Sequence, residues 1–209
     1  MSIASAVRRL FAGRDTIDHA LWHVLVNRVA GSFLVGELNR TRIYRACGLD
    51  VRSTAIHPGQ WFFSAQITIG EGAWLGQGSY FDTRAPITIG ARAGIGPGVR
   101  LVTADHAMGD HDRRAGAYAP RPISIEDGAW VGAGAIVLSG VTIGAGAVIA
   151  SGSVVHRDCE PDMLYGGVPA KPIRALESGE AASQQHAARG SRSGGQRGEG
   201  DRVGGDAGR

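Results

Sequence analysis

The chain has 209 residues, of which 43% are hydrophobic and 33 are glycine, and its formal net charge is +3. This composition suits one main core with appendages and is far from that of a disordered protein. Basic and acidic residues are interspersed without a Lys or Arg run, which disfavours a nucleic-acid-binding protein. Aromatic residues make up only 6%, so the high glycine content favours a core built by repeating small units.

The N-terminal part of the sequence predicts neither a targeting signal nor a membrane span. The N-terminus has no apolar region followed by a cleavage site, and polar residues such as His23 and Arg28 interrupt the apolar stretch 20–30. Cys47 and Cys159 lie far apart without metal-type spacing, which is typical of reduced thiols in a cytoplasmic protein. We therefore expect a cytoplasmic protein without a transmembrane segment, and peripheral contact with a membrane is left open.

Residues 1–50 have a helical pattern. The residues at helical spacing in the first segment are Ile17, Leu21, Val24, Leu25 and Arg28. A second helix is predicted over 37–46, with Gly48 as its stop signal. We expect these helices to form a cap over the open end of the repeat that follows, because its first coil would otherwise expose an apolar cross-section. A role in substrate binding is the alternative.

Large side chains recur every six residues from position 51 onward. The repeated positions are Val51, His57, Phe63, Ile69, Leu75, Phe81, Ile89, Ile95, Leu101, Ile125, Val131, Val137, Ile143, Ile149 and Val155. Among them only His57 is polar, and a two-residue slip separates Phe81 from Ile89. The tetrapeptide Ile-Thr-Ile-Gly and its variants return within this pattern at a period of about eighteen residues.

A period of six within a period of eighteen gives three equivalent faces per turn, which is a triangular prism. Each unit supplies a short strand with one inward aliphatic and a turn where glycine relieves backbone strain. Small side chains four places after each aliphatic fit the corners: Ala73, Ser79, Ala93, Val99, Ala129, Ala135, Val141, Ala147 and Ser153. Stacked coils would pair every strand with neighbours above and below. The pattern predicts a parallel β-solenoid over 51–176, and it leaves the hand of the coil open.

Two segments depart from the repeat. Residues 104–122 are predicted to form a loop that protrudes from one corner, and this loop holds His106 and His111. Long excursions from a rigid scaffold are where function concentrates. Residues 177–209 are rich in Gly, Ser and Gln and have no apolar periodicity, so a disordered tail is predicted there.

Four motifs combine with the repeat to resemble a known family. They are Thr103-Ala-Asp-His106, Ile125-Glu-Asp-Gly-Ala-Trp-Val-Gly132, Gly140-Val-Thr-Ile-Gly144 and Gly166-Gly-Val-Pro-Ala-Lys171. Together they resemble the hexapeptide-repeat acyltransferases, and in particular the maltose, galactoside and exopolysaccharide O-acetyltransferases. The resemblance implies a left-handed parallel β-helix and a homotrimer with acetyl-CoA between neighbouring prisms. It implies no metal, and a sugar hydroxyl of a polysaccharide or its precursor as the acceptor.

The same resemblance assigns roles to residues around the acceptor. His106 matches the general base, and an imidazole can take the proton of a hydroxyl that attacks a thioester. Trp130 matches an aromatic residue beside the acceptor and the acetyl group. The family's acceptor-site asparagine falls at Gly76 here, so Asp82 or Arg84 is predicted to line that site instead.

Further positions match the part of the family's site that holds the coenzyme. Ala133 and Ser151 would offer backbone groups to the pantetheine arm, which suits small residues. Arg157 and Arg174 would face the phosphates, for which guanidinium groups are apt partners.

Two other enzymatic functions remain open, as does a purely structural role. Serine O-acetyltransferases share the solenoid, although they carry a larger helical N-terminal domain. His106 and His111 are five residues apart, a spacing similar to that in zinc-dependent γ-class carbonic anhydrases built on this solenoid. Such a site needs a third histidine about two coils earlier, where residues 66–74 contain none, and His57 would lie a coil too far away.

Overall fold

The computed structural model describes residues 15–177, and the predicted tail, apart from its first residue, lies outside them. Residues 15–176 fall within one compact unit. It begins with α2 (Asp15–His23), which continues into the π-helical η1 (Val24–Ala30), and with α3 (Glu37–Ala46). The predicted short helices are therefore present, and Gly48 follows α3 with a φ of +93°. The side chains of residues 15–18, Ile17 among them, lie outside the described part.

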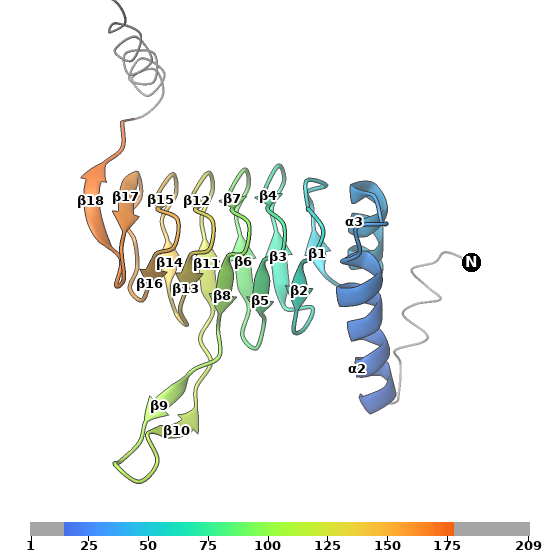
Figure 1. Ribbon diagram of the computed structural model, residues 1–209, viewed down its shortest axis with the longest axis horizontal. Helices are drawn as coiled ribbons and strands as arrows, with labels where there is room; N and C mark the ends of the chain where they lie inside the picture. Colours follow the sequence, from blue (N-terminus) through green and yellow to red (C-terminus); the bar gives the residue numbers. More distant parts are fainter. Residues whose placement is uncertain (1–14, 178–209) are drawn as a thin grey trace, which may run out of the picture. The chain divides into compact units, whose positions relative to one another are not determined.

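Three parallel sheets form the faces of the prism (Figure 1). Sheet A contains β1 (Asp50–Val51), β3 (Ile67–Ile69), β6 (Ile87–Ile89), β11 (Ile123–Ile125) and β14 (Thr142–Ile143). Sheet B contains β4 (Trp74–Leu75), β7 (Gly94–Ile95), β12 (Trp130–Val131), β15 (Val148–Ile149) and β17 (Met163–Gly166), with β18 (Lys171–Ala175) antiparallel at its edge. Sheet C contains β2 (Trp61–Phe62), β5 (Tyr80–Asp82), β8 (Arg100–Val102), β13 (Ile136–Val137) and β16 (Val154–Val155).

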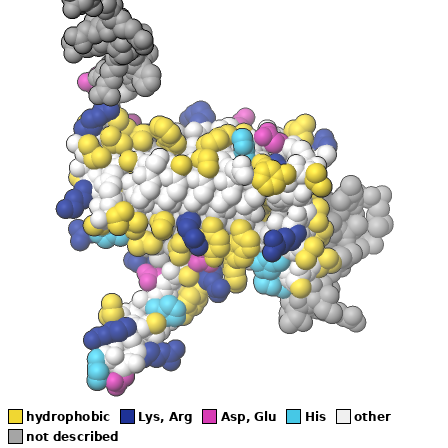
Figure 2. Space-filling view, viewed as in Figure 1, with side chains coloured by type: hydrophobic (Ala, Val, Ile, Leu, Met, Phe, Trp, Pro, Cys, Tyr) yellow, Lys and Arg dark blue, Asp and Glu magenta, His cyan; other side chains and the backbone are white. Residues whose placement is uncertain are grey.

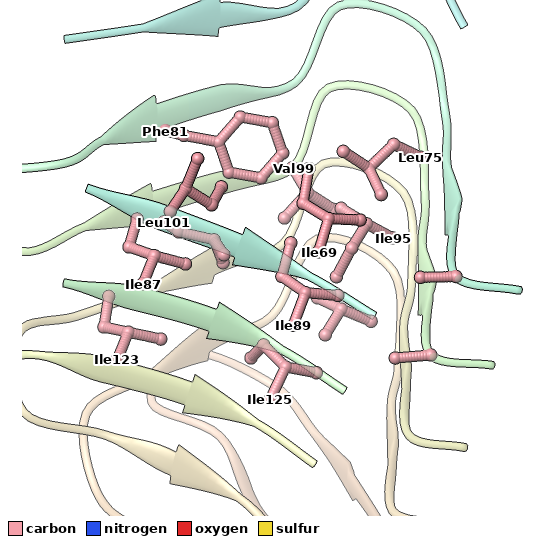
Figure 3. Close-up of a cluster of buried hydrophobic side chains, with 14 of the residues drawn as sticks. Ile69, Leu75, Phe81, Ile87, Ile89, Ile95, Val99, Leu101, Ile123 and Ile125 are labelled. Carbon is pink, nitrogen blue, oxygen red and sulfur yellow. The ribbon is translucent and has the colours of Figure 1, made fainter. Parts of the chain in front are cut away.

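The inward aliphatics stack in ladders through the prism (Figure 3). On sheet A, Ile69 pairs with Ile89 and Ile89 with Ile125, although the protruding segment separates the last two in sequence. All three side chains are fully buried, and the small residues predicted for the corners are buried as well. The predicted parallel solenoid is confirmed. No helix among residues 15–177 is long and apolar enough to cross a membrane.

The first coil departs from the predicted register. The pattern placed His57 and Phe63 inside, but the structure buries Ile56 and Phe62, both with 0% exposure. Phe62 stacks on Phe81 of the next coil with ring centroids 5.0 Å apart. Burying an imidazole without a hydrogen-bond partner is costly, so the coil between β1 and β2 adopts an irregular path that buries isoleucine instead.

Polar side chains attach the helices to this first coil. The buried guanidinium of Arg40 donates to the carbonyls of Ala30, Ser32, Val35 and Ile56. Asn27 accepts from the backbone N–H of Phe62 at 2.8 Å and donates to its carbonyl at 2.9 Å. Asn27 therefore supplies the hydrogen bonds that a preceding strand of sheet C would make, and Arg40 satisfies carbonyls that no ladder reaches.

The corrected register predicts different costs for two neighbouring truncations. Phe62→Ala should lower the free energy of unfolding by about 3–5 kcal/mol, because it empties a buried site between coils. Phe63→Ala should cost clearly less, because that ring is half-buried and lies under the Arg84 guanidinium. Equilibrium urea unfolding of both variants measures the difference, and an equal or larger cost at Phe63 would contradict the register.

Candidate active site

The segment 104–122 is a hairpin rather than an irregular loop. Its strands are β9 (His106–Met108) and the antiparallel β10 (Ala115–Tyr118). The hairpin leaves the prism between β8 and β11, at the corner where sheets C and A meet, and projects away from it (Figure 1). Charged and histidine side chains are concentrated on this projection (Figure 2).

The hairpin fixes the imidazole of His106. Its Nδ1 lies 2.9 Å from the carbonyl oxygen of Gly116 on the opposite strand. A carbonyl only accepts hydrogen bonds, so Nδ1 carries the proton of the neutral ring and Nε2 keeps its lone pair. The ring of Tyr118 packs edge-on with a centroid distance of 5.5 Å. Because the side chain is exposed, Nε2 can accept a proton from a hydroxyl that approaches it.

Asp82 and Arg84 lie near the root of the hairpin. Asp82 is buried, with 3% exposure, and its Oδ2 accepts from the backbone N–H of Ala104 at 3.0 Å. The Nε of Arg84 lies 3.3 Å from Oδ1 of Asp82, which is an ion pair without hydrogen-bond geometry. The Arg84 guanidinium also covers the ring of Phe63 at 3.9 Å. Of the two residues predicted to line the acceptor site, Arg84 is exposed and Asp82 supports the hairpin backbone.

Trp130 stands on the outer face of sheet B, with 55% exposure. It leans over Gly94, where an added Cβ would lie 3.2 Å from the indole Cδ1. Trp74 occupies the same register position two strands away, on the other side of Gly94, and is also exposed. Trp74 was not among the predicted site residues. Its signal is the repeated pattern Gly-Ala-Trp-aliphatic-Gly, which occurs at 72–76 and again at 128–132.

The predicted coenzyme residues lie at two corners of the prism and on the edge strand of sheet B. Ala133 and Ser151 lie in stacked turns at the corner between sheets B and C, where the N–H of Gly152 donates to the Ala133 carbonyl at 2.9 Å. Both side chains are small and exposed. Arg157 follows β16 at the corner between sheets C and A, and Arg174 lies on β18. The structure therefore brings Ala133 and Ser151 together and places Arg157 on a different corner.

His106 and Trp130 lie on opposite sides of the prism. Sheet B, which carries Trp130, is bounded by two corners, and the hairpin of His106 leaves the third one. Figure 1 accordingly shows β12 and the hairpin on opposite sides of the prism. One chain alone does not bring these two side chains together.

Other reactive groups take no part in this arrangement. Burial raises the pKa of the Cys159 thiol to about 12 and also raises that of Cys47, so neither is an activated nucleophile. His111 is exposed near the hairpin tip, with its Nε2 2.8 Å from Asp112. Among the described residues, no three His, Cys, Asp or Glu side chains are grouped so that they could hold a metal ion.

Part of the chain matches a known repeat family. Residues 122–157 match the bacterial transferase hexapeptide family, described as six repeats. A presumed acetyltransferase of Schizosaccharomyces pombe is 49% identical over 94 residues, which are 45% of this chain and 45% of that protein. The chain matches 45% to 60% of the length of the first curated relatives.

Two solved structures extend the likeness to most of the chain. A hexapeptide-repeat acetyltransferase from Vibrio cholerae, complexed with acetyl coenzyme A, is 29% identical with a TM-score of 0.60 and aligns with 83% of this chain and 89% of its own. A maltose O-acetyltransferase from Clostridium difficile 630 is 26% identical with a TM-score of 0.70 and aligns with 82% of this chain and 97% of its own. The matched repeats and these two structures confirm the predicted resemblance to hexapeptide-repeat acyltransferases.

The hydrogen bonds predict opposite tautomers for the two histidines of the hairpin. In neutral His106 the proton should reside on Nδ1, because Gly116 can only accept. In His111 it should reside on Nε2, which faces the Asp112 carboxylate. Nitrogen-15 chemical shifts of the imidazoles distinguish the two forms, and a His106 ring protonated on Nε2 would contradict the assignment.

Proposed function

We propose that this protein transfers the acetyl group of acetyl-CoA to a sugar hydroxyl, in a polysaccharide or one of its precursors. The observation that carries the proposal is the free Nε2 of His106, held on a projecting hairpin by the Gly116 carbonyl. The similar V. cholerae structure holds acetyl coenzyme A, and the similar C. difficile protein is named a maltose O-acetyltransferase. These names support an acetyl donor and a sugar acceptor for this chain.

His106 is the general base of the proposed reaction. Its Nε2 removes the proton of the acceptor hydroxyl while the hydroxyl oxygen attacks the carbonyl carbon of the thioester. A carbon–oxygen bond forms, the carbon–sulfur bond breaks, and the proton on the imidazole passes to the departing thiolate. His106 thus returns to its neutral form without an acyl-enzyme. Trp130 offers an apolar surface beside the reacting groups.

The stacked turns at Ala133 and Ser151 suit a long, narrow co-substrate. Their small side chains let a pantetheine arm approach the backbone closely. Arg157 and Arg174 are exposed and carry the positive charge that phosphates require. We place the reaction in the cytoplasm, where the two free cysteines stay reduced.

A homotrimer completes the proposed site. Because the corner that carries His106 lies opposite sheet B of its own chain, Trp130 must come from a neighbouring copy to stand beside this imidazole. Three prisms related by a threefold axis give three equivalent interfaces of this kind. Each interface then combines the hairpin of one chain with the stacked turns and Trp130 of the next.

Removal of the base should stop the chemical step but not binding. His106→Ala should lower kcat by roughly 10²- to 10⁴-fold with little change in acetyl-CoA affinity, because Nε2 acts on the acceptor proton. His111→Ala is the matched control on the same hairpin and should lower kcat only slightly. Thiol release with acetyl-CoA against sugars, nucleotide-sugars and serine measures both variants and identifies the acceptor.

Other outcomes of this assay would select a different function. If serine is the only acceptor that supports thiol release, the proposed acceptor is an amino acid and not a sugar. Equal losses in His106→Ala and His111→Ala, together with inactivation by a chelator, would indicate a zinc site of the carbonic anhydrase type instead.

A mixed assembly tests whether the site is shared. Coexpression of a His106→Ala chain with a Trp130→Ala chain should restore activity, because some interfaces then join an intact His106 to an intact Trp130. In random trimers about a quarter of the interfaces have this composition. Two differently tagged His106→Ala chains are the control and should stay inactive. Absence of recovery, or a monomer in sedimentation equilibrium at micromolar concentration, would overturn the shared site.

A further inference from the structure

An ion pair joins the two legs of the hairpin where they leave the prism. The Nη2 of Arg121, which follows β10, lies 3.0 Å from Oδ2 of Asp105, which precedes β9. The other carboxylate oxygen, Oδ1 of Asp105, accepts from the backbone N–H of His106 at 2.8 Å. One carboxylate therefore binds both the peptide group of the proposed base and the opposite leg.

Arg121 is itself fastened to the body of the prism. Its backbone N–H lies 3.1 Å from both the hydroxyl of Ser139 and the carbonyl of Thr103. Its guanidinium rests against Gly140, where an added Cβ would lie 3.0 Å from Cζ, Nε and Nη1. Gly140 has a φ of +80°, which favours glycine, and its lack of a side chain also leaves room for the Arg121 guanidinium.

The contacts form a continuous path from the scaffold to the backbone of His106. They run from Ser139 and Gly140 through Arg121 and Asp105 to the backbone of His106. Backbone bonds also hold the root, such as the one from Ala119 N–H to the Asp105 carbonyl at 2.9 Å. The hairpin projects beyond this root, so the root is where side-chain and backbone bonds together connect it to the prism.

We infer that Asp105 and Arg121 form a positioning pair that fixes the His106 imidazole relative to the prism. The inference rests on the proposed function of His106 and goes beyond it, because Asp105 bonds to the backbone of His106 and not to its ring. A misplacement of about 1 Å can cost a factor of about 10² in rate. Asp105 and Arg121 therefore act on the chemical step through His106.

The charge state of Asp105 suits a pair that persists across the working pH range. The hydrogen bond from the His106 N–H, followed by that from Arg121, lowers the pKa of this carboxyl below its ordinary value. A carboxyl with a lowered folded-state pKa contributes stability above its unfolded-state pKa and loses it as the pH falls through the folded-state value. The pair is thus complete at neutral pH and is lost only in acid.

Graded substitutions separate positioning from general stability. Asp105→Ala removes both bonds and should lower kcat by about tenfold to a hundredfold, with the KM for acetyl-CoA unchanged. Asp105→Asn keeps an oxygen for the His106 N–H but loses the charge opposite Arg121. Its kcat should therefore fall less than that of Asp105→Ala. Arg121→Ala combined with Asp105→Ala should cost no more than Asp105→Ala alone, because paired residues are not additive.

The exposed pair Asp50 and Arg52, with 3.4 Å between its charged atoms, supplies the matched control. Asp50→Ala should leave kcat unchanged. One outcome is that the wild-type protein turns over the acceptor while Asp105→Ala and Arg121→Ala keep its full kcat. That outcome would overturn the positioning pair and leave the proposed function intact.

Amide hydrogen exchange at His106 provides a readout that does not depend on turnover. Exchange of this N–H should accelerate in Asp105→Ala, which removes its acceptor, and to a smaller extent in Arg121→Ala, which frees the carboxylate. Unchanged exchange in both variants would overturn the pair even if no acceptor were turned over. Absence of wild-type turnover with the expected exchange would count against the proposed function alone.

Discussion

The structure depends on the burial of one large aliphatic side chain per six-residue unit against the units above and below it. Ile69, Ile89 and Ile125 show this on one face, where each occupies the same place in consecutive coils. A single unit buries almost nothing by itself, so stability comes from the stacking. The same stacking makes the prism rigid, and a segment inserted at one corner is therefore presented in a defined position.

Polar side chains take over where this ladder is interrupted. At the root of the hairpin, Asp82 accepts the backbone N–H of Ala104, and Ser139 shares the N–H of Arg121 with the carbonyl of Thr103. Thr103 adds a further bond from its hydroxyl to the carbonyl of Asp82. Buried backbone groups need partners, so the chain supplies them from side chains where the coil opens. These bonds also place the residue on which the proposed chemistry depends.

The three-faced geometry has a direct consequence for that chemistry. A corner and the face opposite it cannot meet within one prism, which is why His106 and Trp130 of one chain stand apart. In the proposed trimer, the hairpin corner of one copy would meet sheet B of the next, so activity would require assembly. The stacked turns of Ala133 and Ser151 border sheet B, so the same copy would supply both the coenzyme-binding turns and Trp130.

The sequence by itself determined the solenoid from the second coil onward, including its inward residues, its small corner residues and the position of the protruding segment. These follow from a short period, because each unit repeats one local environment. The period also predicted that His57 and Phe63 are buried. Contacts with the next coil and with the helices bury Ile56 and Phe62 instead. Tertiary structure alone placed the Gly116 carbonyl beside Nδ1 of His106 and joined Asp105 to Arg121. Each of these relations links residues on different strands or legs of the chain, whose distances a local pattern does not contain.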